Sequence, residues 1–193
     1  MNSRTLTIIA IACVLIVGAV VTWVDFGIAF TEISSESQVS TTTASTEGRA
    51  FHPDPLVIAE VRAETMNESL LHEELRGALS DVAGLTVVDR ESAPDETPVL
   101  RVNASRSGLY TSVYSRPSLD AEWHYASDGN IEGLLQGEVI TFHGGEDPIR
   151  RISGDTTIDV MMYGVFTRRH FERRVAEVIA RELVGELHDH LSP

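Results

Sequence analysis

The sequence predicts an α+β fold: a two-layer sandwich, with a mainly antiparallel sheet and two helices on one face, preceded by one transmembrane helix. Three observations predict it. An uncharged apolar run lies near the amino terminus, several later stretches alternate apolar and polar residues as strands do, and two stretches repeat apolar residues at helical spacing. A chain of 193 residues suits one domain with an appendage.

The amino-terminal run extends from Leu6 to Val24 without a charged residue. As a helix it would measure about 28 Å, which matches the hydrocarbon core of a bilayer. Arg4 precedes the run and Asp25 follows it, so the positive-inside rule predicts a single-pass protein of the cell membrane, with a cytoplasmic amino terminus and an outer carboxyl-terminal domain. Residues 1–30 are therefore the predicted anchor. The alternative is a leader that is cleaved near residues 27–29.

Residues 31–50 are dominated by small hydroxylated side chains, as in SSESQVSTTTASTEGRA, and show no apolar periodicity. Such a composition cannot offset the entropy of folding, so this segment is predicted to be a flexible Ser/Thr-rich linker. Residues 51–193 are then the exported α+β domain, of normal size for one domain.

The first half of the domain predicts strand, helix, strand. Pro55–Val61 reads as a strand, and the capping-box spacing from Thr65 to Glu68 opens a helix. Gly84 ends that helix, and Leu85–Asp89 forms the next strand. The apolar residues at helical spacing are Leu70, Leu71, Leu75, Leu79 and Val82.

The second half predicts more strands and a long final helix. Val99–Ser105 and Leu119–Ala126 alternate apolar and polar residues, and Asp128-Gly129 supplies a turn after which 131–142 returns as a hairpin partner. A further strand is expected around 158–162. The final helix begins after Thr167, and its predicted buried stripe is Phe171, Val175, Val178, Ile179, Leu183 and Leu187.

In element order, and in the run from LVIAEV through NESLLHEELRGAL to LTVVD, the chain is similar to the small exported domains of envelope-assembly lipoproteins, such as those serving lipopolysaccharide transport or curli secretion. The resemblance is one of architecture. It assigns no residue a role, because a fold does not fix a function.

The formal net charge is −14, and the chain contains no lysine. A nucleic acid is excluded as a partner, because binding a polyanion needs clustered cations and a field of this sign repels it. Abundant carboxylates without lysine resemble the composition of proteins from extreme halophiles. The alternative origin is a GC-rich gene that favours arginine.

Four arginines gather at the start of the last helix, where the helix dipole favours acidic residues instead. One interpretation is that they pair with carboxylates of a nearby acidic sheet. A second is that they form a docking site for an anionic partner, and a third is that they are simply solvated. The cluster consists of Arg168, Arg169, Arg173 and Arg174.

Other candidate sites are sparse. His124 stands on the polar face of its strand and His143 in a loop with two acidic residues, so this region is a weak candidate for a metal. Asn67 and Asn103 fit the N-glycosylation sequon. The chain shows no nucleotide-binding fingerprint and no nucleophile elbow, so we assign no catalytic residue and no cofactor.

Anchor, compact domain and lack of catalytic motifs together favour a membrane-anchored extracytoplasmic interaction domain, an accessory subunit of an envelope assembly or transport system with a protein partner. The alternative is a surface hydrolase or metal-binding protein that uses the His124 and His143 region. A purely structural envelope protein, which associates only with itself, is a third possibility.

Overall fold

The computed structural model describes residues 25–44, 53–94, 96–138, 140 and 148–191. The predicted membrane span from Leu6 to Val24 and the candidate ligand His143 lie outside these residues. Within the described part of the chain, no helix is both long and apolar enough to cross a membrane.

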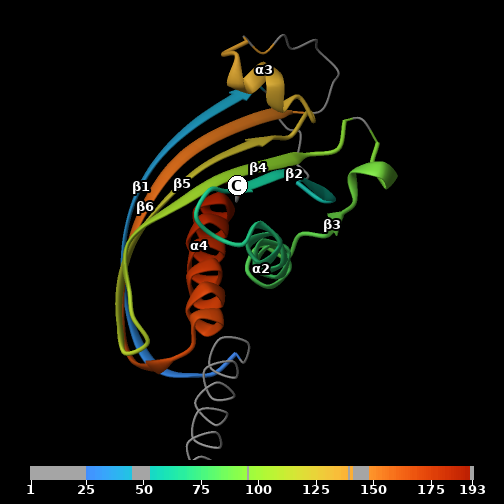
Figure 1. Ribbon diagram of the computed structural model, residues 1–193. Helices are drawn as coiled ribbons and strands as arrows, with labels where there is room; N and C mark the ends of the chain where they lie inside the picture. Colours follow the sequence, from blue (N-terminus) through green and yellow to red (C-terminus); the bar gives the residue numbers. More distant parts are fainter. Residues whose placement is uncertain (1–24, 45–52, 95, 139, 141–147, 192–193) are drawn as a thin grey trace, which may run out of the picture.

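The described residues form a mixed α+β structure around one curled sheet of six strands (Figure 1). The strand order is β1-β6-β5-β4-β2-β3. β2 pairs in parallel with β3 and β4, whereas the other three neighbouring pairs are antiparallel. The strands are β1 (Gly27–Ala44), β2 (Leu56–Ala63), β3 (Val87–Val88), β4 (Val99–Tyr110), β5 (Tyr114–Ala126) and β6 (Ile149–Phe166).

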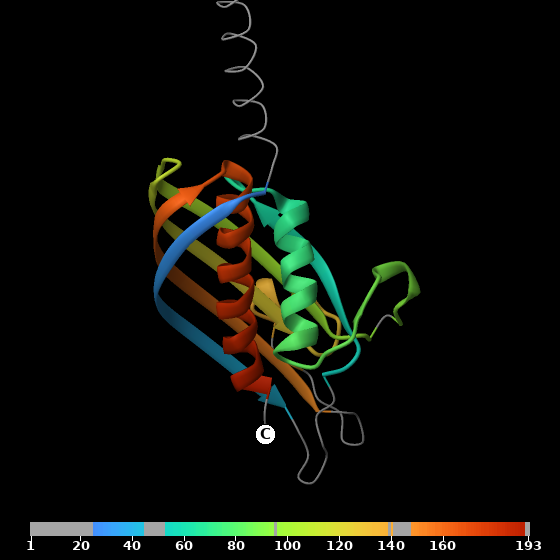
Figure 2. The same ribbon diagram turned by 90° about the horizontal axis from the view of Figure 1, so that it is seen from below.

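Two helices, α2 (Glu68–Asp81) and α4 (Arg168–Leu191), lie side by side on the concave face of the sheet (Figure 2). The predicted α+β class, with a mainly antiparallel sheet and two helices on one face, is thus confirmed, whereas the preceding transmembrane helix stays a prediction. Two short helical segments, η1 (Arg90–Ser92) and α3 (Ile131–Leu135), lie in the connections.

The core lies between the concave face and the two helices, where sequence periodicity predicts it. On β5, Leu119, Trp123 and Tyr125 are fully buried, and Leu100 and Val102 of β4 are too. All six residues of the predicted stripe on α4 are buried. Apolar residues that repeat every second position in a strand, or about every 3.6 positions in a helix, lie on one face of that element. The sequence pattern therefore identifies the faces that turn toward the core.

The cap of α2 differs from the prediction. Asn67, not Thr65, is the N-cap, and its side chain accepts a hydrogen bond from the Leu70 N–H at 3.1 Å. The Thr65 hydroxyl instead accepts the backbone N–H of Arg106 at 2.7 Å, which joins the β2–α2 turn to β4.

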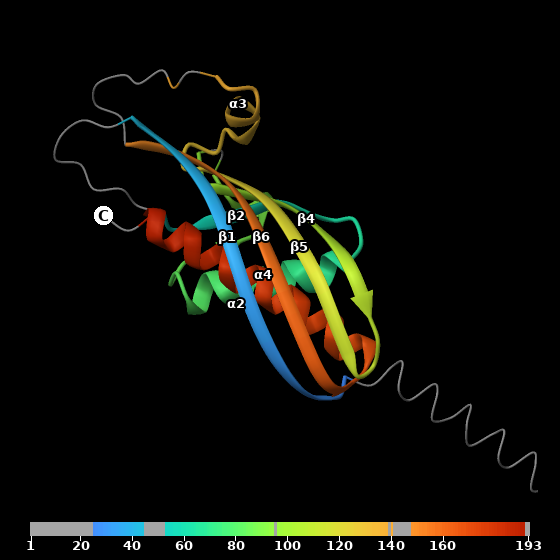
Figure 3. The same ribbon diagram turned by 90° about the vertical axis from the view of Figure 1, so that its left-hand side faces the viewer.

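The prediction of a flexible linker is wrong for residues 31–44. They belong to β1, an 18-residue edge strand that pairs with β6 along its whole length, in one continuous register (Figure 3). Three hydroxyls also bond outside the strand: Ser35 to Glu182 at 2.6 Å, Ser37 to Thr156 at 3.3 Å and Thr41 to His190 at 3.5 Å. β6 and α4, which are distant in sequence, provide the hydrogen-bond partners that stabilise this polar segment as a strand. Its threonines also favour a strand.

The predicted hairpin partner at 131–142 is also wrong for its described residues, 131–138 and 140, none of which lies in a strand. Residues 131–135 form α3, whose N-cap Asn130 accepts the Gly133 N–H at 2.8 Å. The antiparallel neighbours of β5 are β4 and β6, and β6 reaches well beyond the strand predicted around 158–162. Local turn signals at Asp128-Gly129 do begin a turn, but the chain returns to the sheet later than its periodicity indicates.

Burial raises the pKa of the Tyr125 phenol well above its ordinary value. The unfolded chain ionises near pH 10, whereas the folded chain keeps the proton, so stability is full below about pH 10 and falls as the pH rises further, by at most about 1.4 kcal/mol per pH unit. We expect Tyr125→Phe to show a flatter loss in denaturant unfolding measured from about pH 9 to pH 11. Equal slopes for the two proteins would contradict this.

Candidate interaction surfaces

Asp25 and Phe26, the first residues that the structure describes, bind the start of α4, and we call these contacts the clamp. The Thr167 N–H donates to the Phe26 carbonyl at 2.8 Å, and the Phe26 N–H donates to the Thr167 hydroxyl at 3.2 Å. The Asp25 carboxylate contacts His170 Nδ1 at 3.1 Å and forms an ion pair with Arg173. Thr167 also accepts the His170 N–H at 3.2 Å, as an N-cap does. The point where the chain enters the domain is therefore fixed to α4.

All four arginines of the cluster interact with other groups of the chain, and three of them pair with carboxylates outside the sheet. Three of its members pair with carboxylates of α4 or of the clamp, and Arg169 also interacts with other groups of the chain. The pairs are Arg168 with Glu172 at 2.9 Å, Arg174 with Glu177 at 2.6 Å, and Arg173 with Asp25. Pairing with carboxylates is as expected, but their location is not. Docking of an anionic partner stays a prediction.

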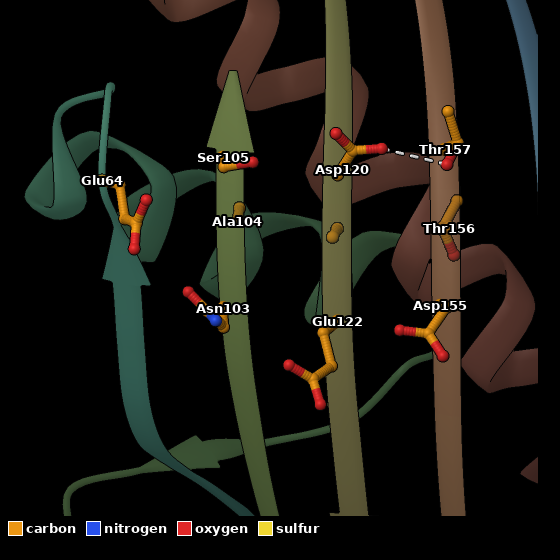
Figure 4. A pocket seen from close by; sticks show the side chains of 10 residues that line it. Glu64, Asn103, Ala104, Ser105, Asp120, Glu122, Asp155, Thr156 and Thr157 are labelled. Atoms are coloured by element: carbon orange, nitrogen blue, oxygen red, sulfur yellow. Dashed lines mark hydrogen bonds between the residues drawn. The ribbon is translucent and has the colours of Figure 1, made fainter. Parts of the chain in front are cut away.

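A hollow of about 310 Å³ lies on the outer face of the sheet, away from the helices (Figure 4). Carboxylates of Glu64, Asp120, Glu122 and Asp155 line it, and Asp120 accepts a hydrogen bond from the Thr157 hydroxyl at 3.0 Å. Four acidic groups on one surface repel anionic ligands. No group of three His, Cys, Asp or Glu side chains able to hold a metal occurs among the residues that the structure describes.

His124 is placed beside this hollow, with both ring nitrogens engaged. Nδ1 lies 3.1 Å from the Ser153 hydroxyl, Nε2 lies 3.1 Å from Glu122 Oε1, and the side chain is 15% exposed. Because His143 lies outside the described residues, the structure does not bring the two histidines together. A site that uses both stays a prediction.

Both sequon asparagines are exposed. Asn67 caps α2 through its side-chain oxygen, and Asn103 lines the acidic hollow on β4. Their glycosylation stays a prediction, with Asn103 standing on the polar strand face that alternation indicates.

A second feature of the outer face was missed by the sequence reasoning. Exposed apolar side chains lie where β1 begins, β6 ends and β4 turns into β5. These ends of the strands lie together in Figure 1. The register places Ile28 opposite Val165 and Phe30 opposite Tyr163, and these last two rings stack with centroids 5.6 Å apart. We call Phe26, Ile28, Phe30, Val113, Tyr163 and Val165 the apolar end patch. The alternation of 26, 28 and 30 could have signalled it, had these residues been read as a strand.

β1 also presents a long open edge. Among the described residues its only strand partner is β6, so its other side carries no strand over 18 residues. Exposed edges of this kind offer unpaired backbone groups to another chain.

Comparisons with known proteins show a loose likeness. No family model matches the chain, and no curated protein matches it. A dodecamer of a leucine-to-methionine variant of PelC from Paraburkholderia phytofirmans is similar in structure, with 14% identity, a TM-score of 0.37, and coverage of 78% of this chain and 98% of that one. A second PelC dodecamer gives 14%, 0.34, 77% and 95%. This likeness is too low to support an argument about function.

Proposed function

We propose that this protein is a membrane-anchored extracytoplasmic interaction domain, an accessory subunit of an envelope assembly or transport system. Leu6–Val24 spans the cell membrane, the amino terminus lies in the cytoplasm, and the α+β domain lies outside. Its partner is another envelope protein, which adds a strand to the edge of the sheet.

The open edge of β1 is the observation that supports this proposal most. The hydrogen bonds of β6 determine which backbone N–H and C=O groups of β1 face β6 and which face the open edge. Gly164 and Phe166 of β6 donate to carbonyls on the β5 side, whereas Thr167 donates to Phe26. Because bonded and non-bonded pairs alternate in an antiparallel ladder, even-numbered residues of β1 bond to β6 and odd-numbered residues present their N–H and C=O groups at the open edge.

This edge can accept a partner strand by β-augmentation, in which main-chain hydrogen bonds provide affinity and side chains provide specificity. Ser37 stands near the middle of β1, opposite Thr156. Because 37 is an odd number, the N–H of Ser37 points to the open edge of β1, away from β6. A proline at this position removes one edge donor and leaves the ladder with β6 intact, since proline is tolerated on edge strands whose N–H faces away from the sheet.

The test is site-specific photocrosslinking of the full chain in its native membrane, with the photoreactive residue at the exposed Gln38. We expect one reproducible protein adduct, several-fold weaker in Ser37→Pro and unchanged in Ser37→Ala, which removes only the hydroxyl. Circular dichroism of both variants checks that the fold is kept.

Equal adduct yields in the two variants would contradict the edge as the binding site. Adducts that contain only this protein would favour a self-associating structural protein over an accessory subunit.

A further inference from the structure

We propose that the apolar end patch rests in the headgroup layer on the outer surface of the bilayer, so that the domain lies on the membrane. This inference rests on the proposed anchoring and names the lipid surface as a second partner of the domain.

The patch has the composition of a membrane-interface surface. Ile28 is 70% exposed, Phe30 67%, and Val113 and Val165 60% each, values unusual for large apolar side chains that gather in one place. The outward face of Tyr163 adds a ring with a polar tip, and its hydroxyl donates to Glu32 at 3.2 Å. A tyrosine side chain suits the boundary between hydrocarbon and water, and phenylalanine is typical of the apolar face that such surfaces bury among the headgroups.

The position of the patch along the chain brings it to the bilayer. The predicted span ends at Val24, and the next residue, Asp25, is already bound to α4 through His170 and Arg173. At about 3.3 Å per residue, Phe30 lies within roughly 20 Å of the end of the span. With the chain clamped there, no length is left for a stalk that could hold the domain away from the membrane.

The polarity of the outer face changes with distance from the predicted membrane span. From the patch at one end of β1 and β6, the face becomes acidic along the strands, with Asp159 and then Asp155 of β6 exposed. The exposed side chains of Arg168 and Arg169 stand at the start of α4, immediately after β6 ends. Cations near the apolar end suit lipid phosphates, whereas Asp159 and Asp155 lie farther along β6, away from the patch.

A second copy of this chain fits the patch less well than a bilayer. The formal charge of each copy is −14, and apposing two outer faces would bring their acidic zones toward each other. Like charges brought together in this way oppose association.

Depth measurement by spin labelling tests the proposal on the full chain in liposomes of phosphatidylcholine and phosphatidylglycerol. In a Cys13→Ala background, nitroxides are attached at Val165→Cys, in the patch, and at Asp159→Cys, on the same face of β6 and outside it. We expect the ratio of collisions with oxygen to collisions with a water-soluble nickel chelate to be several-fold higher at 165 than at 159. A third label, at Leu15→Cys, reports whether the anchor itself is inserted.

Equal ratios at 165 and 159, with the label at 15 inserted, would overturn the inference and leave the anchor standing. A label at 15 that is open to the nickel chelate would overturn the anchoring itself. Protection at 165 accompanied by spin–spin broadening that disappears on dilution with unlabelled protein would assign the patch to a second copy and also overturn the inference.

Discussion

We expect Trp123→Ala to lower the free energy of unfolding by about 3–5 kcal/mol, a large share of the stability of an ordinary domain. The Trp123 side chain is fully buried at the centre of the concave face. Its ring lies against Gly154 of β6, where a Cβ atom would collide with it, and its Nε1–H donates to the Thr156 hydroxyl at 3.4 Å. Removing the ring leaves a cavity between β5, β6 and α4 that the closely paired strands cannot fill.

Denaturant unfolding of the full chain in detergent micelles, followed by circular dichroism, measures this loss. Arg116→Ala is the matched control, because Arg116 is an exposed residue of the same strand. Surface changes of that kind typically stay within about 0.5 kcal/mol. A loss for Trp123→Ala no larger than that of the control would show that the concave face is not the core.

The second large effect is expected from Gly164→Ala, at about 2–5 kcal/mol when backbone strain and overpacking are added. Gly164 has φ +147°, a conformation that L side chains rarely adopt. A Cβ atom there would collide with the Ile28 carbonyl and the Ala29 Cα of β1, which are backbone atoms and cannot turn aside as a flexible side chain can. The start of β1 must therefore move away from β6.

Hydrogen exchange localises this change. Amides in the first residues of β1, next to Gly164, should lose protection, while those near Ala44 at the far end should keep more of it. Gly77→Ala serves as the control, because a Cβ atom at this helical glycine meets no atom within 4 Å, so the substitution should stabilise the protein by up to about 1 kcal/mol. Unchanged protection at the start of β1 in Gly164→Ala would refute the expected displacement.

Because residues 31–44 form a strand and not the predicted linker, the expected position of the domain relative to the membrane changes. A flexible stalk would let the domain reach partners at a distance from the membrane. With the proposed anchoring, a strand that begins three residues after the predicted span, with the clamp at Asp25 and Phe26, would instead hold the domain in a fixed orientation. The open edge of β1 and the apolar end patch share one element, so the proposed partner binding and the proposed membrane contact would both depend on the same strand.

Residues of the candidate surfaces differ in how far the sequence could identify them. The arginine cluster is visible in the sequence, and helical spacing already brings Glu172 and Glu177 near it. Its partner Asp25 becomes apparent only once the clamp is known. The patch unites residues more than 130 positions apart, such as Phe30 and Tyr163, and only strand pairing shows that they touch. His124 looked available as a ligand because its neighbour across the sheet, Ser153, could not be inferred.

The sequence by itself determined the inner faces of the domain. Alternation at Leu119, Ala121 and Trp123 and helical spacing from Phe171 to Leu187 depend on local geometry alone, so they predicted the buried sides of β5 and α4. Only the tertiary structure decided that residues 31–44 form part of a strand and that β6, rather than the segment 131–142, pairs with β5. A polar segment such as β1 contains too little apolar surface to fold on its own, and it becomes a strand because β6 and α4, more than a hundred residues away, provide its hydrogen bonds.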